Sequence, residues 1–189
     1  MSGKYLDAGS LNERLELLEL QETSANTWEW VSVGRLWGQV TVDGGTNLFS
    51  KVGVGARNAK LAIRSREITL HQALRWKGQH LFLTSITKRD RMHLDLQAAL
   101  VSVDMVTLQA DKNATEMTFS GVLTEKYVRH SQEWPMSYND ISLVLVVPKE
   151  VKLRPGCLVA VKDSLWEILI PHELDPYKNE YEIGRRVDL

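Results

Sequence analysis

The residue types that could carry chemistry are scattered along the 189-residue chain and fall into no catalytic pattern. The dipeptide His172-Glu173 lacks the second histidine of the HExxH metalloprotease pattern. The five histidines have no cysteine partners at zinc-binding spacing, and no Gly-x-Ser-x-Gly elbow occurs. Gly53-Val54-Gly55 begins like a dinucleotide-binding fingerprint, but the third glycine is missing. We therefore expect no catalytic residues, no metal site and no cofactor, and a protein that is not an enzyme.

The cysteine content and hydropathy indicate a chain that works away from membranes. The single Cys157 cannot form an intrachain disulfide, which fits a reducing compartment, and we expect it to be a buried small hydrophobe. No run of about 18 apolar residues is present, so we expect no membrane-spanning segment. Residues 1–10 contain Lys4 and Asp7 but no apolar core of a signal peptide, so we expect no secretion signal.

The net charge of -1 hides an uneven distribution of charged side chains. Residues 1–43 carry three basic and seven acidic side chains, residues 44–92 carry ten basic and two acidic, and residues 104–189 carry ten basic and fourteen acidic. A solvated surface would explain this without any function. The alternative is a basic surface that faces an anion, either DNA or an acidic protein partner.

The elements that must position these residues are predicted to be short strands. Residues 92–100 alternate apolar and polar side chains over nine positions, which is the clearest strand signal in the chain. Similar patterns predict strands at residues 27–33, 36–42, 61–70, 80–87, 118–123, 141–147, 157–161, 165–170 and 181–187. Glycines and the absence of acidic residues predict a long loop at 44–60, mobile in the free subunit. We expect an all-β fold of two small barrels or sandwiches.

Two further patterns bear on domain organisation. The polar stretch 111–116 predicts a first domain at residues 1–103, a linker at 104–116 and a second domain at 117–189. Residues 76–101 and 161–189 share an order of turn, strand, charged turn and strand, so the second domain is a candidate duplicate of the first, with chance similarity of two hairpins as the alternative. Residues 11–20 are ambiguous, because strong helix formers overlap a weak alternation.

The six tryptophans divide into candidates for the core and for an interface. Trp28 and Trp30 are spaced by two and should share a strand face. We expect Trp37 and Trp166 to be core residues. Trp37→Ala would then lower the free energy of unfolding by about 3–5 kcal/mol and unfold the subunit. Trp134 lies beside Pro135 in an expected loop and is an interface candidate, together with Tyr138.

The order and spacing of several short segments resemble the phage head-tail joining family, also called head-tail adaptor or head completion proteins. The resemblance covers about residues 8–101 and rests on the segments 8–17, 28–31, 36–40, 62–69, 76–86 and 92–96. Gly38 stands where that family commonly has alanine, which should be harmless in a strand, and the family's typical short members lack everything after about residue 105. The resemblance implies that residues 14–22 form a strand against their helical propensity.

The function that this resemblance implies is structural. It implies a small β-barrel that assembles as a homo-oligomeric ring in the neck of a tailed-phage virion, assembled in the host cytoplasm. Its partners would be a portal or adaptor protein, a tail protein and the genomic DNA that passes through the channel. The expected long loop would then bring Lys51, Arg57 and Lys60 toward that DNA.

Two alternatives stay open at this point. One is another ring-forming tail protein, such as a tail terminator. The other is a nucleic-acid-binding barrel of OB type, suggested by the basic middle region and the aromatic residues. The nucleic-acid-binding hypothesis requires exposed aromatic residues that alternate with Lys and Arg. In the sequence only Trp76, between Arg75 and Lys77, fits this requirement well.

Overall fold

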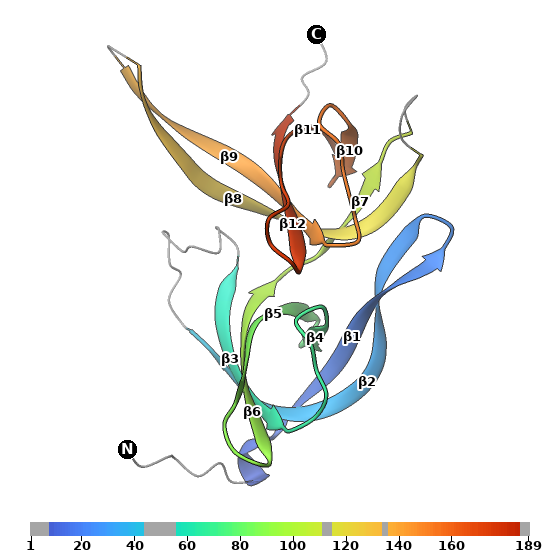
Figure 1. Ribbon diagram of the computed structural model, residues 1–189, viewed down its shortest axis with the longest axis vertical. Coiled ribbons are helices and arrows are strands. Elements are labelled where there is room, and N and C mark those ends of the chain that lie inside the picture. The colour runs from blue at the N-terminus through green and yellow to red at the C-terminus, as the bar shows by residue number, and fades with distance from the viewer. Residues whose placement is uncertain (1–7, 44–55, 111–114, 134–135, 186–189) are drawn as a thin grey trace. The chain divides into compact units, whose positions relative to one another are not determined.

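The computed structural model of the protein describes residues 8–43, 56–110, 115–133 and 136–185, and for 126–133 and 136–142 it describes the backbone alone (Figure 1). The described residues contain one short 3-10 turn, Ala8–Ser10, and twelve strands, so the fold is all-β as the alternation predicts. Within the described part, no helix is long and apolar enough to cross a membrane. The strands are β1 (Glu13–Ser24), β2 (Thr27–Val42), β3 (Arg57–Arg64), β4 (Ala73–Trp76), β5 (Gln79–Lys88), β6 (His93–Val101), β7 (Asp104–Leu108), β8 (Met117–Glu133), β9 (Met136–Pro148), β10 (Leu158–Val161), β11 (Ser164–His172) and β12 (Lys178–Arg185).

The chain divides into two compact units. Unit 1 takes its described residues from 8–19, 30–43 and 57–101, whereas unit 2 contains 20–29 and nearly everything after 101. In unit 1 the strand order is β1-β4-β5-β6-β3-β2, and β1 also pairs with β2, so the sheet closes on itself as a six-stranded barrel (Figure 1). Closure removes the free edges that would otherwise pair with other chains.

Unit 2 closes in the same way. Its order is β8-β7-β10-β11-β12-β9, and the β8–β9 pairing completes the ring of strands. The end of the β1–β2 hairpin also belongs to this unit, because Thr27 and Trp28 pair in parallel with Thr118 and Phe119 of β8. Strand pairing therefore runs through all twelve strands.

The two barrels have the same topology. Strands β1 to β6 pair as 1–2, 2–3, 3–6, 6–5, 5–4 and 4–1, and strands β7 to β12 repeat these pairings in the same chain order. From β4 to β6 the correspondence is a constant shift of 85 positions. The tight turn at Lys77-Gly78 matches Lys162-Asp163, all four with positive φ, and the bulge between Leu83 and Ser85 matches that between Ile168 and Ile170.

The turn after the bulge follows the same shift of 85 positions. In unit 1, Asp90 Oδ1 accepts hydrogen bonds from the backbone amides of Met92 and His93, at 2.6 and 2.8 Å. In unit 2, Asp175 Oδ1 accepts them from Tyr177 and Lys178, at 2.8 and 3.2 Å. Turn type, bulge and turn carboxylate therefore agree at one shift, while duplication itself stays a prediction.

Each barrel has its own core of inward side chains. In unit 1 the fully buried residues include Leu15, Ile63, Leu74 and Leu81, and in unit 2 they include Val106, Phe119, Leu145, Val159 and Tyr181. Gly38 in unit 1 and Gly121 in unit 2 lie at tight points of these cores. A Cβ at Gly38 would come within 2.9 Å of Leu15 Cδ1, and a Cβ at Gly121 would come within 3.0 Å of Leu145 and Val106. Alanine at Gly38 is therefore not the harmless exchange expected from the sequence, because buried neighbours must move.

Several expectations about elements change. The ambiguous residues 11–20 lie largely in β1, where Leu15, Leu17 and Leu18 are buried, so tertiary packing overrides helical propensity as the resemblance implied. The stretch 104–116, expected as a linker, contains β7 at Asp104–Leu108. The expected strand at 61–70 ends at Arg64, and the two expected strands at 27–33 and 36–42 are one strand, β2. The two-domain organisation itself stays a prediction.

Candidate functional site

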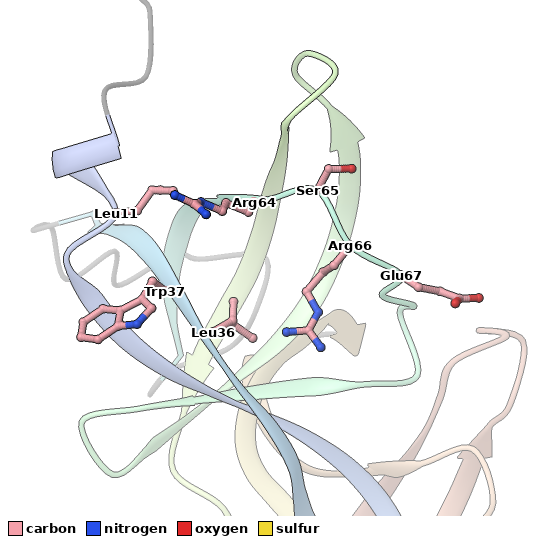
Figure 2. A pocket seen from close by; sticks show the side chains of 7 residues that line it. All are labelled: Leu11, Leu36, Trp37, Arg64, Ser65, Arg66 and Glu67. Atoms are coloured by element: carbon pink, nitrogen blue, oxygen red, sulfur yellow. The ribbon is translucent and has the colours of Figure 1, made fainter.

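A hollow of about 780 Å³ opens on unit 1 and is the candidate site (Figure 2). Leu11, just before β1, and Leu36 of β2 are both buried, whereas Trp37 of β2 is 58% exposed. Arg64 ends β3, Ser65 forms a bend, and Arg66 and Glu67 follow outside any strand. The lining thus combines apolar surface, an exposed indole ring and two guanidinium groups.

Trp37 lies outside because of the pairing register of β2. Successive side chains of a strand point to opposite faces, and Leu36 and Gly38 face the barrel interior. Trp37 therefore points outward with Gln39, and the expectation that it is a core residue is wrong. A signal for this was present in the sequence, because Trp37 shares its parity with the polar Gln39 and Thr41, while Leu36 shares its parity with Val40.

The positive charge of the hollow comes from the segment that follows β3. The Arg66 side chain runs back toward β2, and its guanidinium lies 3.9 Å from where a Cβ on Gly34 would stand. Glu67 points away from Trp37 (Figure 2). The Ser65 amide donates to the Met92 carbonyl at 2.6 Å, which anchors this segment to the residue before β6. Arg64 and Arg66 are both exposed and give the hollow a basic character.

The corresponding segment of unit 2 packs differently. Residues 149–157 follow β9 as 65–72 follow β3. Val151 and Leu153 are buried in the unit 2 core, whereas Ile68 and Leu70 are only partly buried against the unit 1 core. Two buried polar side chains hold Val151 and Leu153. Asn179 Nδ2 donates to the Val151 carbonyl at 2.8 Å, and the Leu153 amide donates to the Tyr181 hydroxyl at 3.0 Å.

The same two positions explain the difference between the barrels. At the shift of 85, Leu94 and Leu96 of unit 1 stand where unit 2 has Asn179 and Tyr181. Neither leucine side chain can form a hydrogen bond with residues 65–72, the segment that follows β3. Burial raises the pKa of Tyr181 to about 12, and its hydroxyl also donates to Glu173 Oε1 at 2.8 Å. Both segments carry exposed basic side chains, Arg64 and Arg66 in unit 1 and Lys152 and Arg154 in unit 2, so the difference between the barrels lies in the hydrogen bonds that Asn179 and Tyr181 make and that leucine side chains cannot make.

The structure does not place all three expected DNA-facing residues in the loop predicted at 44–60. Arg57 and Lys60 lie in β3, so placing them in a loop was wrong, and Lys51 lies outside the described residues. Arg57 and Lys60 are both exposed, and Lys60 stands opposite Thr41 of β2 and Gln97 of β6. The expected mobility of 44–60 also falls mostly on residues outside the description.

The expected interface residues cannot be placed as side chains. Trp134 lies outside the described residues, and Tyr138 is described by its backbone alone, in β9 opposite Ser131. Trp28 and Trp30 belong to different units. Trp28 packs on the core of unit 2, whereas Trp30 contacts Phe82 of unit 1 edge to face, with 5.3 Å between the ring centroids. Trp166 packs against the second core, as expected for a core residue.

Trp76 is a weaker nucleic-acid candidate than its sequence neighbours suggest. Its Nε1 donates to Glu13 at 3.0 Å, and the Lys77 ammonium lies 4.4 Å above its ring and 3.3 Å from the same carboxylate. The hydrogen bond from Trp76, together with Lys77, lowers the pKa of Glu13. Arg75 pairs with Glu16 at 3.3 Å. Carboxylates of β1 thus offset both cations that flank Trp76.

Metal ligation finds no geometric support in the part of the chain that the structure describes, where no three His, Cys, Asp or Glu side chains gather around one point. His80 and His93 lie on the adjacent strands β5 and β6 but have different partners. His80 stacks on Phe82, and His93 Nδ1 forms a hydrogen bond with Asp90 at 3.0 Å. Burial, reinforced by the charge of Arg75, lowers the pKa of His80 to about 4.

Comparison with known proteins gives one partial likeness. No protein-family model matches the chain, and no curated protein matches it. Among solved structures, one chain of the "Virion of native gene transfer agent (GTA) particle" is 20% identical with a TM-score of 0.40. The match covers 48% of this chain and 96% of that chain.

Proposed function

We propose that this protein is a structural component of a tailed-phage virion that forms a ring in the neck, between the portal and the tail. The observation that carries the proposal is the coincidence of two features in one stretch of chain. The segments that resemble the head-tail joining family, within residues 8–101, fall on β1, β2, β3, β5 and β6, which belong to one closed six-stranded barrel.

The barrel supports such a role physically. A ring subunit needs no active site but needs a rigid body with two different contact surfaces, since a head-to-tail contact closes into a ring when its rotation closes. Closed barrels with separate buried cores provide rigidity, and exposed Trp37, Arg64 and Arg66 are residue types that dominate binding energy at interfaces. The protein would act by stoichiometric assembly, without turnover.

Its partners in this proposal are further copies of itself, a portal or adaptor protein, a tail protein and the DNA that passes through the channel. Exposed Arg57 and Lys60 of β3 would contribute weak, sequence-independent attraction for that DNA, because phosphate contacts carry no base information. Strong binding would oppose passage of the DNA.

Complementation tests this role. A phage lacking the gene should produce filled heads and separate tails that do not join, visible by electron microscopy, and the wild-type gene supplied in trans should restore complete virions. Complete virions from the deletion phage would end the proposal. Turnover of a substrate by the purified protein would also contradict it.

A second candidate function rests on one observation, the exposed indole of Trp37 beside two guanidinium groups. Such a surface can stack a base and attract phosphates, so single-stranded nucleic acid is the alternative ligand. Binding of a labelled oligonucleotide that falls steeply with salt and disappears in Trp37→Ala would favour this function. Salt-independent or absent binding would leave the structural role as the better account.

A further inference from the structure

The turn between β11 and β12 of unit 2 presents apolar side chains to solvent. Leu174 is fully exposed, Leu169, the residue in the β11 bulge, is 51% exposed, and Ile170, which follows the bulge, is 39% exposed. Large exposed apolar side chains in this turn and in the strand that leads to it are candidates for contact with a partner. Residues 167–182 also carry five acidic side chains (Glu167, Glu173, Asp175, Glu180 and Glu182) against one basic, Lys178.

The equivalent turn of unit 1 has the opposite character. At the shift of 85, residues 88–91 read Lys-Arg-Asp-Arg where residues 173–176 read Glu-Leu-Asp-Pro. The shared aspartate, Asp90 or Asp175, builds both turns with the same two backbone hydrogen bonds. The backbone is thus preserved while the exposed side chains have become basic in one copy and acidic and apolar in the other.

The hollow of unit 1 complements the turn of unit 2 in both respects. Its apolar part, made by Leu11, Leu36 and Trp37, suits an exposed leucine. Arg64 and Arg66 outnumber the one carboxylate of the lining, Glu67, and suit the carboxylates of a partner. The basic turn of unit 1 would be repelled by the same arginines. The hollow therefore discriminates between the two turns of the chain and favours the one on unit 2.

We infer that copies of this chain associate head to tail, with the β11–β12 turn of one copy docked in the unit 1 hollow of the next. This inference rests on the proposed function in naming a second copy as the partner of the hollow. Leu174 enters beside Trp37, and the carboxylates of the turn lie near Arg64 and Arg66. Since the two surfaces differ, the pair of copies still has one free hollow and one free turn after the first contact, so growth continues until a ring closes.

Sedimentation velocity over a concentration series tests this contact on the full chain. The wild type should form assemblies larger than dimers that weaken with salt, because charge pairs contribute to the contact. Leu174→Asp, and separately Arg64→Glu with Arg66→Glu, should raise the apparent dissociation constant by at least about tenfold. All these side chains are exposed, so circular dichroism should show folded proteins.

The duplicated barrel offers matched controls. Met105→Asp changes an exposed apolar residue of β7, and Lys152→Glu with Arg154→Glu reverses two exposed charges on the unit 2 segment that corresponds to 65–72. Both controls should assemble like the wild type. A wild type that stays monomeric, or controls that lose assembly as strongly as the test variants, would overturn the inference.

Mixing the two defective proteins tests polarity. The Leu174→Asp chain keeps its hollow and the Arg64→Glu, Arg66→Glu chain keeps its turn, so an equimolar mixture should form heterodimers and grow no further. A mixture that stays monomeric contradicts a hollow–turn contact. Variants of the hollow that lose oligonucleotide binding but keep self-association would assign the hollow to nucleic acid instead.

The outcomes separate this inference from the proposed function. If both variants assemble normally while the deletion phage fails to join heads and tails, the inference fails and the neck role stands. If the variants lose assembly but the deletion phage still makes complete virions, the contact stands and the neck role fails.

Discussion

The location of Trp37, on the surface and not in the core, follows from the pairing register of its strand. A tryptophan within an apolar strand pattern is more often buried, but the inward positions of β2 are taken by Leu36 and Gly38. Gly38 packs so closely on Leu15 and Ile63 that no large side chain fits on that face of the strand there. The indole therefore lies on the outer face, where it forms part of the hollow instead of the core.

Trp37→Ala should consequently cost about 1 kcal/mol or less of unfolding free energy, the scale of surface substitutions. Urea denaturation followed by circular dichroism measures this. Trp166→Ala, which removes a side chain packed on the second core, is the comparison and should cost clearly more. A loss for Trp37→Ala equal to that for Trp166→Ala would mean that Trp37 is buried after all.

His80 should make stability depend on pH in a defined window. Its pKa is about 4 in the folded protein against 6.5 for an ordinary histidine, because burial and Arg75 disfavour the imidazolium. Between these values the unfolded chain binds more protons, so stability is full above pH 6.5 and falls as the pH drops toward 4. At about 1.4 kcal/mol per pKa unit the upper limit of the loss is about 3.5 kcal/mol, and the observed loss should be smaller because the ring is only partly buried and solvent screens its charge.

The measurement is the unfolding free energy of the wild type and of His80→Gln from pH 7 to pH 4. The wild type should lose stability relative to the variant as the pH falls, because glutamine does not titrate. Parallel curves for the two proteins would show that His80 does not contribute.

At the scale of elements, the turns after β5 and β11 depend on one carboxylate each. Asp175 Oδ1 accepts from two backbone amides, and alanine would leave both without that acceptor. Asp175→Ala should lower the unfolding free energy by about 1 kcal/mol and speed amide exchange at Tyr177 and Lys178. Asp175→Asn keeps a side-chain oxygen and should retain most of the protection. Unchanged exchange in Asp175→Ala would contradict the role given to this carboxylate.

At the scale of the whole molecule, the two separate cores predict that damage to one barrel stays local. Leu83 and Ile168 are buried, occupy equivalent positions before the two bulges and belong to different cores. Leu83→Ala and Ile168→Ala should each cost about 2–5 kcal/mol. Hydrogen exchange should rise mainly in residues 57–101 for the first variant and in residues 143–185 for the second. An equal rise throughout the chain for either variant would show that the barrels unfold as one cooperative unit, against the expected two domains.

The features that were predictable from the sequence are those set by neighbouring residues. The alternation at 92–100 marks β6, and the Lys77-Gly78 and Asp90 turns are visible because glycine and aspartate have specific backbone roles. The order of turn, strand, charged turn and strand, which the two barrels share, was visible for the same reason. Local chemistry therefore determined the all-β class and much of the strand order along the chain.

Tertiary structure decided what depends on partners distant in sequence. It made Leu15 and Leu17 strand residues, since their burial opposite β4 outweighs a helical propensity of a few tenths of a kcal/mol per residue. It formed β7 from residues expected as linker, because β8 and β10 supply hydrogen bonds on both sides. The hollow of unit 1 arises in the same way, because Leu11, Trp37 and Arg66 meet only when β1, β2 and the chain after β3 close the barrel.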